Sequence, residues 1–256
     1  KITSSNQLPD ATVGGIVGEA MAYTTIAACR FAGSITFEKY RGELTVGGIA
    51  GSTDGTVNGC LNEGGITVEV TENGSVSGGG ITGDCNGKNI RITGCVNRGK
   101  LSGNSTSYKT EGISLAGIVG TNFSGSTINN CLNEGEINIR FSSSQTVYSP
   151  FSAAGITTSN YGLVINSGNT GRIAVQSDMK ATVGGISSHN SGSIVNSYNI
   201  GAIACNGRKG QTFYNNGGGI TGVFQYSTIG ITPLIYGCYN SGTVSSTGSE
   251  EQIGSI

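Results

Sequence analysis

The feature that most constrains this chain is an internal repeat with a period near 34 residues. A Gly-Ile step recurs seven times, with 33, 32, 37, 38, 30 and 34 residues between successive isoleucines. The steps are Gly15-Ile16, Gly48-Ile49, Gly80-Ile81, Gly117-Ile118, Gly155-Ile156, Gly185-Ile186 and Gly219-Ile220. Periods of roughly 20–50 residues are typical of solenoids and related arrays, in which each unit buries its apolar face only against its neighbours.

A second element lies between these steps and reads apolar-x-x-Cys/Ser-x-Asn-x-Gly-x-apolar. In the second copy it comprises Val57, Cys60, Asn62, Gly64 and Ile66. Serine replaces the cysteine in the fifth and sixth copies, and phenylalanine replaces the asparagine in the first. Each repeat therefore contains three strand-like segments separated by turn residues, around Gly-Ile, around the cysteine and at the alternating apolar residues that follow.

We predict an all-β fold, a parallel β-helix (β-solenoid) of about seven coils of roughly 34 residues with three short strands per coil. The 45 glycines disfavour helices, and with only three prolines and no three-residue period they do not indicate collagen. We expect residues 1–256 to form a single solenoid domain that is part of a larger surface protein.

Two columns of charged residues support parallel stacking in register. The residue after the asparagine and the residue after the following glycine change sign from copy to copy. The two columns are Glu63, Arg98, Glu134 and Lys100, Glu136, Arg172. Opposite charges on neighbouring strands stabilise a sheet, so we expect these residues to pair between coils.

The cysteines indicate packing. Seven is an odd number, and no Cys-x-x-Cys or Cys/His spacing predicts disulfides or zinc. Five of them occupy one column, which we expect to form a ladder inside the coil; they are Cys29, Cys60, Cys95, Cys131 and Cys238. We expect Cys205 in the core and Cys85 in the turn after Gly83. The asparagine column is interpreted as a turn device.

The repeats resemble the GLUG motif, which is named for a Gly-Leu-x-Gly core. The matching steps are Gly-Ile-Val-Gly at 15–18 and 117–120, Gly-Ile-Ala-Gly at 48–51, and Gly-Ile-Thr-Gly at 80–83 and 219–222. Isoleucine replaces leucine throughout, and residues 155–158 and 185–188 lack the final glycine. The resemblance implies a bacterial surface or secreted protein, adhesin-like or similar to the non-catalytic regions of immunoglobulin-A-specific zinc peptidases, whose His-Glu-x-x-His motif is absent here.

Aromatic residues in the loops before the Gly-Ile steps are the candidate binding residues. We expect them to emerge on one side of the rod, joined by two aromatics in an enlarged insertion of the seventh copy. The candidates are Tyr40, Tyr108, Tyr148, Phe151, Tyr214, Phe224 and Tyr226. Tyrosine offers an apolar face and a polar tip that suit a glycan or a host or partner protein, although these rings could instead only cap the solenoid wall.

The leading hypothesis is a non-catalytic, adhesin-like module at the bacterial cell surface, without cofactor or metal. One alternative is a carbohydrate-active β-helix lyase or hydrolase, for which Glu38 and Glu69 are the stacked acids, unless Lys39 and Arg41 neutralise them. The other is an inert stalk of a larger peptidase. Near-neutral charge, with 14 basic and 15 acidic residues, does not indicate nucleic acid, and no apolar run of 18 residues predicts membrane insertion.

Overall fold

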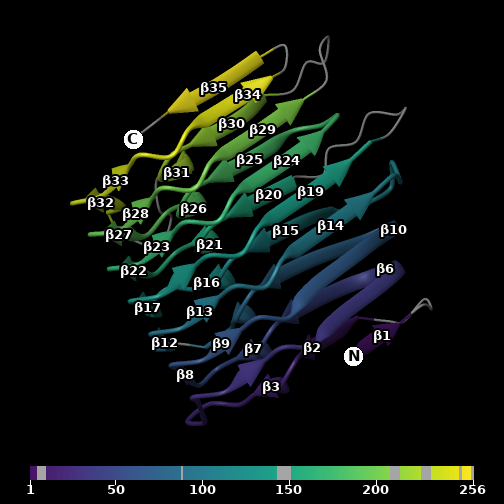
Figure 1. Ribbon diagram of the computed structural model, residues 1–256, viewed down its shortest axis with the longest axis vertical. Helices are drawn as coiled ribbons and strands as arrows, with labels where there is room; N and C mark the ends of the chain where they lie inside the picture. Colours follow the sequence, from purple (N-terminus) through teal and green to yellow (C-terminus); the bar gives the residue numbers. More distant parts are fainter. Residues whose placement is uncertain are drawn as a thin grey trace.

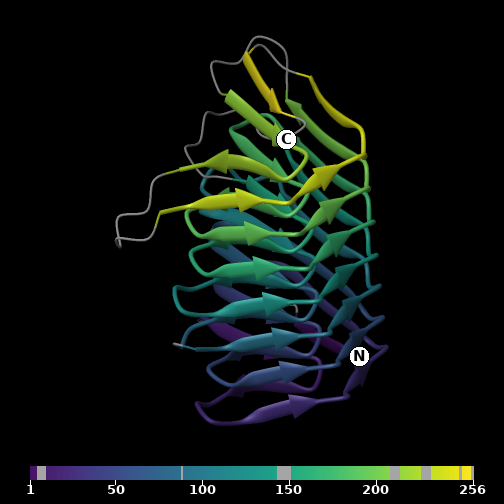
Figure 2. The same cartoon turned by 90° about the vertical axis from the view of Figure 1, so that its left-hand side faces the viewer.

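The protein winds into a stack of coils. The computed structural model describes residues 1–4, 10–87, 89–142, 151–207, 214–225, 232–247 and 250–254. All regular structure in these ranges is β-strand, and every strand pair is parallel. Successive coils rise from the N-terminal to the C-terminal end (Figures 1 and 2). The predicted parallel β-solenoid is confirmed.

Three walls of the solenoid are seven-stranded sheets with one strand from each coil. Sheet B contains β3 (Val17–Ala20), β7 (Ala50–Thr53), β11 (Thr82–Cys85), β16 (Val119–Asn122), β21 (Thr157–Asn160), β26 (Ser187–Asn190) and β31 (Thr221–Phe224). Sheet C contains β4 (Thr25–Ala27), β8 (Thr56–Asn58), β12 (Arg91–Thr93), β17 (Thr127–Asn129), β22 (Leu163–Ile165), β27 (Ser193–Val195) and β32 (Leu234–Tyr236). Sheet D contains β5 (Arg30–Phe31), β9 (Leu61–Asn62), β13 (Val96–Asn97), β18 (Leu132–Asn133), β23 (Gly168–Asn169), β28 (Tyr198–Asn199) and β33 (Tyr239–Asn240). We number the coils 1 to 7 from their sheet B strands.

Sheet A has two arms. The first arm contains β1 (Ile2–Ser4), β14 (Leu101–Ser105), β19 (Ile137–Phe141), β24 (Ile173–Ser177), β29 (Ile203–Gly207) and β34 (Val244–Thr247). The second contains β2 (Ala11–Gly14), β15 (Gly112–Ala116), β20 (Phe151–Ala154), β25 (Ala181–Gly184), β30 (Tyr214–Gly218) and β35 (Glu250–Gly254). Two long strands, β6 (Ser34–Gly47) and β10 (Gly65–Gly79), run through both arms. In Figure 1 the second-arm strands run back toward sheet B.

Most coils therefore have more strands than the three segments predicted. The turn at the cysteine divides one predicted segment into a sheet C and a sheet D strand, and sheet A contributes both arms. The second arm was missed because the residues before Gly-Ile vary, from Val46-Gly47 to Ala153-Ala154. Their burial depends on the first arm, which packs against them.

The Gly-Ile step forms the sharp corner between the second arm and sheet B. A Cβ on Gly117 would overlap both the Gly155 carbonyl oxygen of the next coil and the Asn133 side chain. The corner isoleucines of coils 2 to 7 are buried, as Ile118 and Ile156 illustrate. The glycine column therefore marks a corner that has no room for a side chain.

The asparagine column forms a buried hydrogen-bonded ladder. In every member but the last, Asn240, the side-chain Nδ2 donates to Oδ1 of the asparagine in the next coil at 2.7–2.8 Å. It also donates to the carbonyl two residues further along its own chain, as Asn133 does to Gly135 at 3.0 Å. The members are Asn62, Asn97, Asn133, Asn169, Asn199 and Asn240. The residue is therefore a turn device, as predicted, and in addition links successive coils.

The cysteine column is confirmed as an interior ladder of thiols. Cys95 Sγ lies 3.4 Å from the Thr93 carbonyl and 3.8 Å from the Val57 carbonyl of the preceding coil. Hydrogen bonding with Cys131 is the main cause that raises the pKa of Cys95 to about 12. Cys205 is buried in sheet A, as expected.

The prediction for Cys85 is wrong. It is fully buried at the end of β11, in register with Thr53 and Asn122, rather than in a turn. Thr53 occupies this column in coil 2 and asparagine in coils 4 to 6, so residue type did not reveal it. Asn122 Nδ2 donates to Asn160 at 2.8 Å, while its Oδ1 has no hydrogen-bond partner, since Cys85 provides no amide below it.

The charge columns pair between coils as predicted. Arg98 contacts Glu134 at 2.6 Å and Glu63 at 3.8 Å. Glu136 contacts Lys100 at 3.0 Å and Arg172 at 3.2 Å. The predicted parallel register accounts for both columns.

Candidate functional site

Among the described residues, the predicted aromatic positions fall in different parts of the fold. Tyr40 lies in β6 and Tyr108 follows β14, so both belong to the region that joins the two arms of sheet A. The Tyr108 side chain is 43% exposed, with Lys109 Nζ 5.6 Å from its ring centroid. Phe224 is exposed but ends β31 in sheet B, away from that region.

Of the remaining aromatic candidates, only Phe151 has a described side chain. Tyr214 begins β30 at the start of the second arm, and Tyr148 and Tyr226 lie outside the described residues. Phe151 was predicted at the surface, and that prediction is wrong. It is fully buried, stacked on Phe141 with ring centroids 4.6 Å apart. The first position of β20 faces the first arm, so the ring fills the core.

The acids of the enzyme alternative lie in neighbouring strands. Glu38 in β6 and Glu69 in β10 are both exposed, at an irregularity where the pairing shifts between Val68 and Val70. Among the described residues, no group of three His, Cys, Asp or Glu side chains could hold a metal ion. His189 is mostly buried, and this burial lowers its pKa.

The outer face of sheets C and D changes character along the rod. In coils 2 to 4 its outward residues are threonine, asparagine and aliphatic side chains beside the paired charges. In coils 6 and 7 they are aromatic and aliphatic, apart from Ser193. We call this second region the C-terminal aromatic face; it consists of Val195, Tyr198, Ile200, Leu234, Tyr236 and Tyr239.

Stacking between coils positions the rings of this face. Tyr198 and Tyr239 are in register in sheet D, and their rings stack nearly parallel with centroids 5.5 Å apart. Gly168 precedes them in this column, and a Cβ there would overlap the Tyr198 ring. Tyr236 is 67% exposed and Tyr239 53% exposed. Exposed apolar groups in one region of a surface are typical of interaction sites.

Sequence reasoning missed this face because it considered only the loops before Gly-Ile and the insertion of the seventh copy. The signal was available in the columns: the residue before the ladder asparagine is Leu61 in coil 2 and tyrosine at 198 and 239. Outward positions on a stacked sheet are free to vary. A column that changes from aliphatic to aromatic is therefore a candidate surface for recognition.

The fold defines the class of this protein as a parallel β-solenoid, in which columns of like residues hold the coils together. Comparisons of the chain with protein-family models, with curated proteins and with solved structures found no match. Among the described residues there is no helix of the length and hydropathy that a membrane crossing requires.

Proposed function

We propose that this chain is a non-catalytic, adhesin-like module at the bacterial cell surface that presents a binding surface for a glycan or a partner protein. The observation that carries the proposal is the C-terminal aromatic face. Its rings point outward from sheet strands and leave the core to other residues. A rigid sheet that displays aromatic groups suits recognition, since little side-chain freedom is lost on binding.

The interior supports the same proposal. The buried polar groups of the asparagine and cysteine columns are occupied in holding one coil to the next. The charged groups that follow the sheet D strands of coils 3 and 4 are occupied in ion pairs between coils. These columns make the rod stiff, as a spacer or display scaffold requires. The GLUG resemblance supports the surface location.

The test is an adhesion assay with beads that carry the chain. The beads are applied to surfaces coated with glycans, extracellular-matrix proteins or host cells, with Thr67→Ala as the surface control. We expect the double variant Tyr236→Ser/Tyr239→Ser to reduce adherence about tenfold or more and to retain the thermal unfolding midpoint. Loss with Tyr108→Ser instead would assign binding to the loops. Equal adherence of all variants, or none by the parent, contradicts the proposal.

The enzyme alternative has a separate test. Glu38 and Glu69 are in neighbouring coils, which is the observation in its favour. If they act on polyuronides, the parent chain should turn these substrates over and Glu69→Gln should abolish turnover. Absence of turnover by the parent, measured by release of reducing ends or unsaturated products, favours the binding module.

A further inference from the structure

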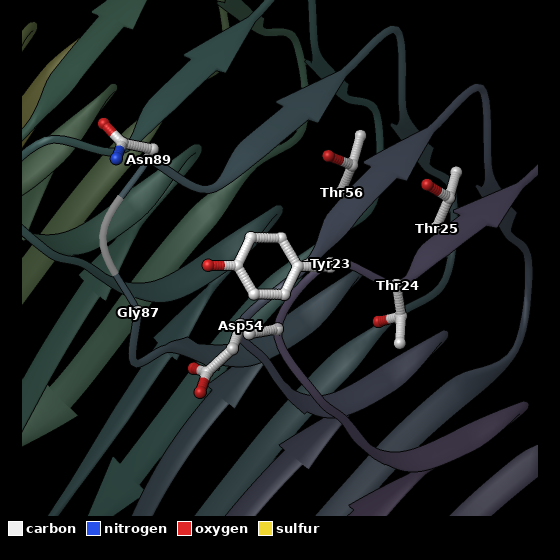
Figure 3. Close-up of a pocket in the computed structure, with 9 residues that line it drawn as sticks. Tyr23, Thr24, Thr25, Asp54, Thr56, Gly87 and Asn89 are labelled. Atoms are coloured by element: carbon white, nitrogen blue, oxygen red, sulfur yellow. The ribbon is translucent and has the colours of Figure 1, made fainter.

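A hollow lies at the edge between sheets B and C in coils 1 to 3, remote from the sequence-predicted loops. Its volume is about 470 Å³, within the usual range of about 300–1,000 Å³ for small-molecule sites. Its side chains come from the turns and strand starts of three successive coils (Figure 3). The polar and aromatic ones are Tyr23, Thr24, Thr25, Asp54, Thr56 and Asn89.

The backbone fixes the position of Tyr23 beside this hollow. Thr24 closes a turn by donating from its N–H and Oγ1 to the Met21 carbonyl, at 3.3 and 2.6 Å. Tyr23 adopts a left-handed conformation in this turn, with φ of 66°. Such a backbone is rare for a bulky residue and often accompanies function. The Tyr23 ring is fully exposed, so the fold gains no packing from it.

Stacking of the coils fixes the positions of Asp54 and Thr56, which also line the hollow. The Asp54 N–H donates to the Ala20 carbonyl at 2.8 Å, and the Thr56 N–H donates to the Thr24 carbonyl at 2.9 Å. A Cβ on Gly87 would lie 3.3 Å from the Asp54 carboxyl group, which places that carboxylate beside the coil 3 turn. Backbone hydrogen bonds between coils therefore place these side chains around the hollow.

The chemistry of the lining matches a sugar. Threonine hydroxyls, one carboxylate and one amide can donate to and accept from sugar hydroxyls, while the Tyr23 ring offers an apolar face for a pyranose ring. Asp54 is the only charged side chain among the described lining residues, which disfavours anionic ligands. One carboxylate is too few ligands for a dedicated cation site.

A second hollow of about 280 Å³ continues along the same edge in coils 4 to 6. It is lined by Tyr161, whose ring stacks on Phe123 with centroids 6.3 Å apart, and by Thr127 and Ser193 of sheet C. One outward column of sheet C links the two hollows through Arg91, an exposed cation whose guanidinium can donate hydrogen bonds to sugar hydroxyls. Its strands are spaced by about 4.8 Å, comparable with the length of one sugar unit, so a linear chain could match the coils along the edge.

We propose that this edge is a binding site for a linear, neutral polysaccharide, with Tyr23 and Tyr161 as stacking platforms and Asp54 and Asn89 as hydrogen-bonding groups. The inference rests on the proposed binding role and names a ligand class and a site for it. Its larger hollow, beside Tyr23 in coils 1 to 3, lies at the other end of the rod from the C-terminal aromatic face in coils 6 and 7.

The test is isothermal titration of the chain with linear cello-, xylo-, manno- and chito-oligosaccharides of two to six units. We expect at least one series to bind with affinity that rises with length. Tyr23→Ala and Asp54→Ala should weaken binding about tenfold or more, and Tyr161→Ala should weaken only the longest ligands. Tyr23→Phe, which keeps the ring, should retain affinity. Thr67→Ala, at an exposed position of sheet A outside both proposed sites, is the control and should bind as the parent does.

Two results would overturn the site. One is that no oligosaccharide in the panel binds. The other is that binding is unaffected by Tyr23→Ala and Asp54→Ala, in which case the chain still binds glycans and only this location is wrong. Preference for an oligogalacturonide over its neutral counterparts would refute the neutral ligand class. If this site is overturned, the proposed function is still tested separately by the adhesion assay with the variants of Tyr236 and Tyr239.

Discussion

Coils 2 to 4 and coils 6 to 7 have the same interior and different exteriors. Inside, both present the asparagine and the cysteine or serine in register. Outside, the first region has ion pairs such as Arg98–Glu134, and the second has the stacked rings of Tyr198 and Tyr239. The difference teaches that stacking fixes the residue types of the interior columns, whereas exterior columns can pair either charges or rings, so the outer face of each coil can be adapted to a ligand.

The corner glycine gives the strongest test of the shared interior. Gly117→Ala places a methyl group against the Gly155 carbonyl and the Asn133 side chain. We expect it to lower the unfolding free energy by more than about 3 kcal/mol, because the backbone of two coils would have to move. Denaturant unfolding followed by circular dichroism measures this loss. Gly65→Ala, at an open position, is the control, and an equal effect of both variants would refute the corner argument.

The asparagine ladder should contribute more to stability in the middle of the rod than in its last coil. Asn133→Ala leaves Asn97 Nδ2 without its acceptor and Asn169 Oδ1 without its donor, so we expect a loss of about 2–3 kcal/mol. Asn240 is only half-buried and has a ladder partner on one side, Asn199. Asn240→Ala should therefore cost clearly less in the same unfolding measurement. Equal losses would mean that the ladder is not cooperative along the rod.

Asp84 in coil 3 is half-buried and allows a pH test of the contact between sheet B and the second arm. Its carboxylate accepts a hydrogen bond from Ser77 Oγ at 2.8 Å, and burial raises its pKa above the usual value. Since the folded-state pKa is above the unfolded one, ionised Asp84 destabilises the fold, and this cost disappears as the pH falls through the raised pKa. We expect Asp84→Asn to stabilise the protein at pH 7 and to have no effect in acid below the ordinary pKa of aspartate.

Urea unfolding at several pH values measures this difference. Glu111→Gln, at an exposed position near the same arm, is the control and should give nearly the same stability as the parent at each pH. A destabilised Asp84→Asn variant at pH 7 would show that the hydrogen bond from Ser77 outweighs the cost of burying the charge.

The smallest effect is expected for the charged columns of the first region. Glu136→Gln leaves Lys100 and Arg172 without their shared carboxylate, but all three side chains are substantially exposed. We expect a loss of at most about 0.5 kcal/mol that vanishes at high salt. Hydrogen bonding with Asn138 and the two cations lowers the pKa of Glu136, so this small contribution is lost as the pH falls through that lowered value. A salt-independent loss would indicate a packing role instead.

Alignment of the repeats could predict the solenoid, the register and the interior ladders, because each of these depends on residues that recur at one period. It failed at Phe151 and Cys85, which occupy columns whose residue type changes between coils. The burial of Phe151 depends on Phe141 in the opposite arm, a contact that no spacing within the repeat encodes. Tyr108 was correctly expected to be exposed, whereas the outward ring of Tyr239 was not considered.

The sequence by itself determined which residues hold the coils together, since glycine recurs at the corner of every coil and asparagine in the turn of every coil but the first. Only the tertiary structure decided what the coils present to other molecules. The second arm of sheet A, the stack of Tyr198 on Tyr239 and the hollow beside Tyr23 each combine residues about 30 or more positions apart. Such groupings arise from stacking side by side, where neighbours in space come from successive repeats.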